Sequence, residues 1–238
     1  MSASKIGAFF DLDDTLFPKP SLEWRFLGHL LARDEITSSA ALRWLGNWAK
    51  ALLRNPRAAV DENKSYLCGL PESLARDWVN SLEPGSPQMF SEGLARMSWH
   101  ITQQHQVFFV SGTPGFLARA IARSLPGPIE VIASELEVCG GYSTGRLAGE
   151  HMSGKAKCRA VRALAEQRGL RLERSYAYGD QSADLPMLEA VGHPFAVNPA
   201  ARLRRIARKR GWPVCGWKAL PAAAREECGQ WSSVRETR

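Results

Sequence analysis

Short apolar runs alternate with amphipathic segments along this chain of 238 residues. Four runs have the length and continuous hydrophobicity of buried parallel strands: Lys5–Leu12, Gln106–Ser111, Ser175–Tyr178 and Pro194–Asn198. Most segments between them repeat apolar residues at helical spacing. Strands that alternate with helices predict an α/β fold built on a parallel sheet.

The amphipathic segments predict the helices. Ser21 and Thr37 can each cap a helix near the N-terminus. Further helices are expected at Pro71–Leu82, Pro87–Gln104, Pro114–Ser124, Lys155–Arg168, Asp184–Ala190 and Ala200–Arg210. After a short strand from Ile129, Leu136–Leu147 predicts a β-hairpin with Gly140-Gly141 at its turn.

About 85 mostly helical residues separate the first strand from the next strand signal, whereas a crossover between parallel strands requires about a dozen plus its helix. We therefore predict an inserted helical cap at residues 17–84. Residues 1–16 and 85–216 would form the α/β core, and residues 217–238 a polar C-terminal tail.

The net charge of +7 favours acidic partners, although charge alone does not choose among phosphorylated metabolites, lipids and nucleic acid. We interpret the basic segment 200–210 as a solvated helix face. Nucleic acid is therefore not expected as a partner, and weak association with an anionic membrane surface is kept as an alternative. Nothing in the sequence indicates an oligomeric state.

Several features favour a cytoplasmic protein. The N-terminal residues run directly into the first strand without a secretory pattern, and no stretch approaches the roughly 20 apolar residues that span a bilayer. The five cysteines are odd in number and show no C-x-x-C pair, which is typical of reduced thiols. His100 and His105, five residues apart, do not share a helical face, and zinc is not expected.

Polar side chains stand at the ends of three predicted strands, namely Asp11, Ser111 and Asp180. In an open parallel sheet these ends meet at one crevice. A carboxylate about 4 Å from a phosphate repels it by roughly 4 kcal/mol at an effective dielectric constant near 20. Mg²⁺ offsets such repulsion, and it is usually held by one or two carboxylates with phosphate and water oxygens.

The D-x-D-x-T stretch after the first strand suits phosphoryl transfer. Asp11 and Asp13 lie on one face of an extended segment, so both can reach one phosphate. One carboxylate can attack as a nucleophile while the other moves the proton. The hydroxyl of Ser111, the amide of Gly112 and the ammonium of Lys157 can stabilise the phosphoryl oxygens.

The sequences DLDDT, VSG, GKAK and GDQSAD, in this order, resemble the four motifs of the haloacid dehalogenase (HAD) superfamily. The helical insert and the GD-x-x-x-D form of the last motif are similar to subfamily IB, which contains the phosphoserine phosphatases. The resemblance extends from about Gly7 to Asn198. It implies a Rossmann-like core with a helical cap, and a Mg²⁺-dependent phosphatase that forms a phosphoaspartate.

The resemblance also implies residue roles. Asp11 would be the nucleophile and a metal ligand, and Asp13 would be the acid/base and give its backbone carbonyl to the metal. Asp180 would ligate the metal, and Asp184 would orient metal-bound water. Five residues would support or bind the phosphate: Thr15, Ser111, Gly112, Lys157 and Asn198. The G-x-x-K spacing from Gly154 selects Lys157 over Lys155.

The leaving group is not identified, because the insert departs from the phosphoserine phosphatase pattern. Pro20 stands nine residues after Asp11, where those enzymes have a glutamate, and Glu23 follows three residues later. Candidate cations are Arg57 and Lys64. A small phosphorylated metabolite is the expected substrate; the alternatives are a lipid-phosphate phosphatase such as phosphatidylglycerophosphatase, a phosphotransferase and a non-catalytic phospho-ligand binding module.

Overall fold

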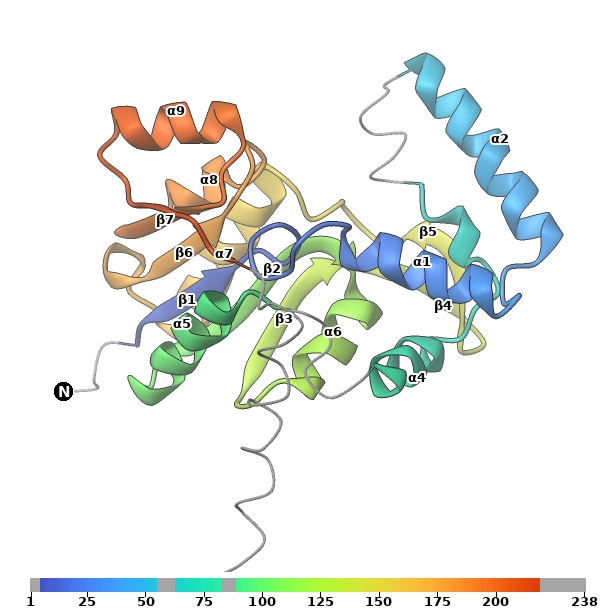
Figure 1. Ribbon diagram of the computed structural model, residues 1–238, viewed down its shortest axis with the longest axis horizontal. Helices are drawn as coiled ribbons and strands as arrows, with labels where there is room; N and C mark the ends of the chain where they lie inside the picture. Colours follow the sequence, from blue (N-terminus) through green and yellow to red (C-terminus); the bar gives the residue numbers. More distant parts are fainter. Residues whose placement is uncertain (1–4, 55–62, 83–88, 219–238) are drawn as a thin grey trace, which may run out of the picture.

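The computed structural model describes residues 5–54, 63–82 and 89–218. A six-stranded sheet in the order β3-β2-β1-β6-β7-β8 forms the centre (Figure 1). All its strands pair in parallel, which confirms the predicted α/β class. The strands are β1 (Gly7–Phe10), β2 (Gln106–Pro114), β3 (Ile129–Ser134), β6 (Tyr176–Gly179), β7 (His193–Val197) and β8 (Val214–Cys215). The two-residue strand β8 was not predicted, because it is too short to show a pattern.

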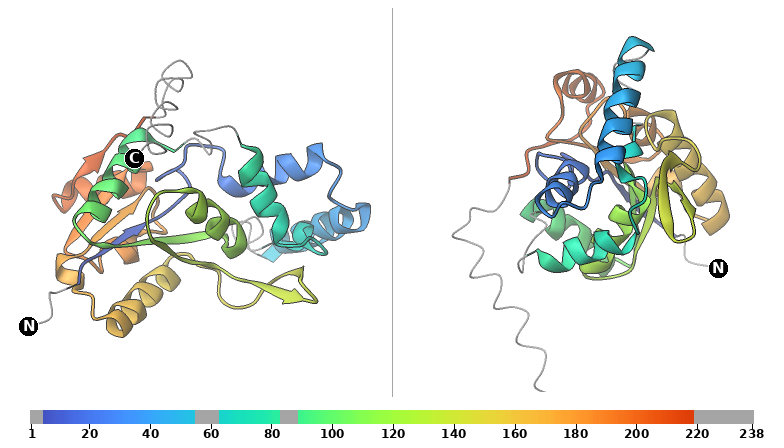
Figure 2. Two further views of the ribbon diagram at one scale, coloured as in Figure 1. Left: turned by 90° about the horizontal axis from the view of Figure 1, so that it is seen from below. Right: turned by 90° about the vertical axis from the view of Figure 1, so that its right-hand side faces the viewer.

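Alternate residues of the central strands point into two separate cores. Phe10 packs on one face of the sheet with α5 (Ser91–Thr102) and α6 (Gly115–Ser124). Phe9 packs on the other face with α7 (Lys155–Arg168), α8 (Leu185–Leu188) and α9 (Ala201–Lys209). Figure 2 shows the sheet between α5 and α7. Both faces are covered, which explains why the strands are continuously apolar.

The helical insert lies beyond the carboxyl ends of the strands (Figure 1). It contains α1 (Leu22–Ala32), α2 (Ser38–Arg54), the 3-10 helix η1 (Ser65–Leu67) and α4 (Ser73–Ser81). The predicted caps are confirmed, since Ser21 Oγ accepts from the Trp24 amide at 3.4 Å and Thr37 Oγ1 from the Ala40 amide at 3.3 Å. The division at residues 17–84 stays a prediction.

The predicted hairpin, β4 (Leu136–Cys139) and β5 (Tyr142–Leu147), is confirmed and packs against the insert. The Gly69 amide donates to the Ser143 carbonyl at 2.8 Å, and the Ser143 amide donates to the Leu70 carbonyl at 2.9 Å. Phe26 of α1 also contacts Phe116 of α6, with ring centroids 5.9 Å apart. The base of the insert is therefore packed on the α/β core.

His100 and His105 lie together, although their spacing did not predict it. Helix α5 ends at Thr102, and Gln104 adopts a φ of 59°, which turns the chain back. The two Nδ1 atoms are 2.8 Å apart, and His100 Nε2 lies 2.8 Å from the Tyr178 hydroxyl. Burial lowers the pKa of His100 to about 3, so this histidine is a neutral part of the core.

The remaining features are a short helix and the C-terminal residues. A further 3-10 helix, η2, spans Leu172–Arg174. In the described part of the chain, no helix has both the length and the hydrophobicity to cross a bilayer. Of the predicted tail, only Trp217 and Lys218 are described; residues 219–238 and the candidate Arg57 lie outside the described residues.

Candidate active site

Asp11 stands where β1 leaves the sheet. Its amide still donates to the Tyr178 carbonyl at 3.0 Å, so the nucleophile candidate is fixed by the β1–β6 pairing. The next residues form a tight turn, in which Asp14 has a φ of 61° and donates its amide to the Phe17 carbonyl at 2.7 Å. Aspartate tolerates this left-handed conformation better than most residues. The turn separates the side chains of Asp11 and Asp13 from that of Asp14, which forms an ion pair with Lys19 at 3.4 Å.

Four charged groups meet at the carboxyl ends of β1 and β6. One carboxylate oxygen from each of Asp11, Asp180 and Asp184 lies within 4.8 Å of the others. The Lys157 ammonium, from the first turn of α7, lies 2.5 Å from Asp11 Oδ1 and 2.6 Å from Asp184 Oδ1. All four residues are buried. The sequence placed these residues in three separate motifs, and the fold brings them into contact.

Asp184 holds the loop of the last motif in place. Its Oδ2 atom accepts from the amides of Asp180, at 3.2 Å, and Gln181, at 3.0 Å. A Cβ atom on residue 179 would lie 2.5 Å from the Asp184 Cβ, so only glycine fits there. Asp184 therefore fixes both the backbone that carries Asp180 and the ammonium of Lys157.

The carboxylates are crowded, and this favours a cation. Burial raises the pKa of Asp11 to about 7 although Lys157 opposes the shift, and burial with Asp11 and Asp184 raises the pKa of Asp180 to about 9. Asp11 and Asp184 raise the pKa of Lys157 despite its burial, so it stays charged. Among the described residues, this ammonium is bonded to two of the three carboxylates, and the hard oxygen donors of all three fit a Mg²⁺ ion.

Asp13 is not part of this cluster, and both of its carboxylate oxygens accept hydrogen bonds. Oδ1 accepts from the Leu22 amide at the start of α1, at 2.6 Å, and Oδ2 accepts from the Thr113 hydroxyl at 2.9 Å. Burial raises the pKa of Asp13, while these two hydrogen bonds oppose the shift. A carboxyl group with a raised pKa can give up and take back a proton near neutral pH. Because it accepts from the Leu22 amide, Asp13 also connects the start of the insert to the site.

Ser111 and Gly112 lie where β2 departs from its neighbour. The β2–β3 register shifts between Ser111 and Pro114, and the Thr113 amide donates to Ser111 Oγ at 3.2 Å. The Ser111 hydroxyl donates to Thr113 Oγ1 at 3.1 Å, and Thr113 donates in turn to Asp13. Sequence reasoning missed Thr113, whose only signal is its place two residues after Ser111.

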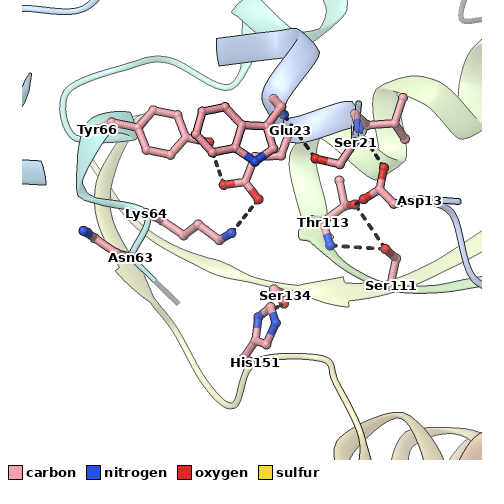
Figure 3. A network of polar contacts seen from close by, with 12 residues as sticks. Asp13, Ser21, Glu23, Asn63, Lys64, Tyr66, Ser111, Thr113, Ser134 and His151 are labelled. Carbon is pink, nitrogen blue, oxygen red and sulfur yellow. Dashed lines mark hydrogen bonds and ion pairs between the residues drawn. The ribbon is translucent and has the colours of Figure 1, made fainter. Parts of the chain in front are cut away.

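A cavity of about 520 Å³ opens above these residues. Core residues line one end, and residues of α1, α2 and η1 line the other. Figure 3 shows a second polar group there: Glu23 accepts at Oε2 from the Lys64 ammonium, at 2.5 Å, and at Oε1 from the Tyr66 hydroxyl, at 2.7 Å. His151, from the loop before α7, also lines the cavity. No sequence pattern indicated a role for Tyr66 or His151, because the residues that they contact are distant along the chain.

Two of the predicted phosphate residues do not line this cavity. Thr15 is fully buried below the loop, where its hydroxyl lies 3.5 Å from Asp180 Oδ1. Asn198 has its side-chain oxygen bonded to the Trp217 amide at 2.9 Å. It lines a separate depression beside Asp14 and Gln181. The structure thus brings Asp11, Asp13, Ser111, Gly112, Lys157, Asp180 and Asp184 together at the cavity, without Thr15 and Asn198.

Comparison with known proteins shows the family to which this chain is similar. Residues 8–189 match the haloacid dehalogenase-like hydrolases. The phosphoserine phosphatase SerB1 of Mycobacterium tuberculosis is 36% identical over 230 residues, which cover 92% of this chain and 73% of that protein.

Solved structures share the fold. A protein of unknown function from Bordetella pertussis Tohama I is 26% identical, with a TM-score of 0.71 over 90% of this chain and 99% of that one. A phospho-aspartyl intermediate analogue of phosphoserine phosphatase is 19% identical, with a TM-score of 0.60 over 94% of this chain and 99% of that one. The chain therefore belongs to the haloacid dehalogenase-like hydrolase family and is a phosphatase-type enzyme similar to the phosphoserine phosphatases.

Proposed function

We propose that the protein is a Mg²⁺-dependent phosphomonoester hydrolase that acts through a phosphoaspartate on Asp11. One observation carries the proposal: Asp11 lies buried at the floor of the cavity, 2.5 Å from the Lys157 ammonium and within a cluster of three carboxylates. A carboxylate in such a place can attack phosphorus, provided that the negative charges around it are offset.

In the first half-reaction, an Asp11 oxygen attacks phosphorus and the bond from phosphorus to the ester oxygen breaks. Asp13, protonated, gives its proton to the departing oxygen, so the alcohol leaves neutral. Ser111, Gly112 and Lys157 donate to the phosphoryl oxygens. Two hydrogen bonds, from the Leu22 amide and the Thr113 hydroxyl, orient the Asp13 carboxyl group during this step.

In the second half-reaction, Asp13 takes a proton from water, and the oxygen of that water attacks phosphorus. The acyl-phosphate bond breaks, which returns Asp11 as a carboxylate and releases inorganic phosphate. Asp13 is then protonated again and ready for the next ester. One residue can serve both steps because acid and base catalysis alternate in them.

Asp11, Asp180 and the backbone carbonyl of Asp13 would hold Mg²⁺, with Asp184 orienting its water. The ion would supply positive charge against the phosphoryl oxygens. Thr15 supports the loop in this proposal, and the role of Asn198 in phosphate binding stays a prediction.

The substrate is proposed to be a small phosphorylated metabolite, and the named relative makes phosphoserine the first compound to test. The inserted helices of residues 17–84 would act as the cap that selects the leaving group. A cytoplasmic location stays a prediction from the sequence, and weak contact of the basic helix α9 with anionic membranes stays an alternative to a solvated helix face.

The test is hydrolysis of phenyl phosphate with Mg²⁺ by the native chain and by Asp11→Asn. We expect the substitution to lower kcat by more than about 10³-fold, because it removes the nucleophile. A folded Asp34→Asn variant, altered at an exposed turn, is the control. Full activity of a folded Asp11→Asn variant would disprove the mechanism. A panel with phosphoserine and phosphatidylglycerol phosphate, with and without acceptor alcohols, would separate the lipid-phosphatase and phosphotransferase alternatives.

A further inference from the structure

The cavity has two ends: the proposed phosphate end, with Asp11 and Lys157, and the proposed leaving-group end, with Glu23, Lys64 and Tyr66. The charges of Glu23 and Lys64 compensate each other. The Lys64 ammonium is buried and bonded to Glu23, and the other Glu23 oxygen is bonded to Tyr66. An amino acid leaving group would need a free anion for its ammonium and a free cation for its carboxylate. Among the described residues of this end, the acid and the cation are bonded to each other, so these residues offer hydrogen-bonding groups without net charge.

His151 stands between this end and the phosphate end. A Cβ atom on residue 112 would lie 2.9 Å from His151 Cε1 and 3.0 Å from Nε2, so the imidazole rests directly on Gly112. The pKa of His151 is lowered to about 4, chiefly by burial. The charges of Lys64, Glu23 and Lys157 also act on this pKa. The neutral ring therefore lies close enough to both ends of the cavity for their charges to act on it.

Ser134 determines which ring nitrogen of His151 carries the proton. Ser134 is fully buried, and its Oγ accepts from the Met152 amide at 3.0 Å. In the described part of the chain, the only acceptor for its own hydroxyl proton is His151 Nδ1, at 3.0 Å. A buried hydroxyl rarely leaves its proton without a partner, so Nδ1 accepts and Nε2 carries the hydrogen.

The Nε2–H group is thus a fixed donor without a partner among the described residues, on the wall of the cavity. Figure 3 shows the ring extending from its loop to Ser134, and its Cε1–Nε2 edge lies against Gly112. Trp24, Trp44 and Leu27 add apolar side chains to the lining of the same cavity. Hydroxyl groups, which both donate and accept, match such a mixture, while the C–H faces of a carbon skeleton pack on aromatic rings.

We propose that His151 is a specificity-determining residue that donates from Nε2 to the leaving group, and that this leaving group is an uncharged polyhydroxylated alcohol, as in a sugar or polyol phosphate. The inference rests on the proposed phosphatase function and names its substrate class. Such an alcohol would be bound through its hydroxyl groups, whereas an amino acid would need a free anion for its ammonium and a free cation for its carboxylate.

The experiment compares ribose 5-phosphate, phosphoserine and phenyl phosphate with Mg²⁺. For the native chain we expect the highest kcat/KM with ribose 5-phosphate. His151→Phe should lower the ratio of kcat/KM for ribose 5-phosphate to that for phenyl phosphate by about tenfold, mainly through KM, because one hydrogen bond is lost. His151→Gln, which keeps an N–H donor, should restore most of the ratio. Ser134→Ala should lower it by a smaller factor, since the ring then loses its fixed tautomer.

His29→Phe, on the same helix as Glu23 but away from the cavity lining, is the control and should keep the native ratio. Equal losses for all three substrates in His151→Phe, or a preference of the native chain for phosphoserine, would overturn the inference while phosphatase activity stands. If the native chain hydrolyses none of the three, the proposed function itself fails.

Discussion

The two ends of the cavity balance their charges differently. At the proposed phosphate end, the described residues include three buried carboxylates, and the ammonium of Lys157 is bonded to two of them, Asp11 and Asp184. At the leaving-group end, one carboxylate, Glu23, has an ammonium and a hydroxyl to itself and keeps 21% of its side-chain surface exposed. The first end has more acidic groups than cations among the described residues, which a metal ion can offset. At the second end, the charges of the described residues compensate each other.

This difference indicates where charge serves catalysis and where it serves structure. A buried ion pair adds little net stability, but removing one partner leaves a costly uncompensated charge. In the proposed mechanism the imbalance at the phosphate end would be useful, because it would recruit a cation to the place where phosphoryl charge develops. At the leaving-group end the closed pair fixes the shape of the wall.

The largest effect is expected when the lysine is removed from each end. Lys157→Met should lower kcat by about 10²–10³-fold, because the phosphoryl oxygens lose a donor, and should lower the free energy of unfolding by about 3–5 kcal/mol. Lys64→Met should cost less stability, since Glu23 keeps Tyr66 and contact with solvent. Chemical denaturation and steady-state kinetics measure both, and the exposed Lys155→Met is the control. Equal losses of stability for both lysines would contradict the contrast.

An effect of intermediate size is expected from Mg²⁺. At a concentration about 100 times its Kd, the ion should stabilise the fold by about 2.7 kcal/mol, or roughly 5–10 °C in Tm. Asp180→Asn should be more stable than the native chain in EDTA, because one of three crowded carboxylates is gone, and should gain less from Mg²⁺. Thermal unfolding measures this. An identical Mg²⁺ response in both proteins would remove Asp180 from the metal site.

The smallest effect is expected at Thr113, whose hydroxyl joins the end of β2 to Asp13. Its hydrogen bond opposes the burial that raises the Asp13 pKa, so Thr113→Val should raise this pKa further. Asp13 must be protonated in the first half-reaction, and the high-pH limb of kcat/KM should therefore move to higher pH. We expect kcat to fall by about tenfold, as for one lost hydrogen bond. Thr144→Val, an alteration in the hairpin, should leave the pH profile unchanged.

Much of the fold was readable because its patterns are local. Continuous apolar runs mark strands that are buried on both faces, and Ser21 and Thr37 mark the starts of α1 and α2. Two features escaped: β8 is too short to show periodicity, and the contact of His100 with His105 depends on the turn at Gln104. The packing of the hairpin against the insert was also hidden, because those segments lie far apart in sequence.

The sequence by itself determined the phosphate end. Asp11, Ser111, Asp180 and Lys157 each stand next to a strand end or a helix start, and parallel topology then forces these ends together. Only the tertiary structure decided the other end. Glu23 meets Lys64 and Tyr66 across 41 and 43 residues, and Ser134 orients His151 across 17. Such contacts depend on how the insert packs on the core, and side-chain packing between distant segments leaves no periodic trace in the sequence.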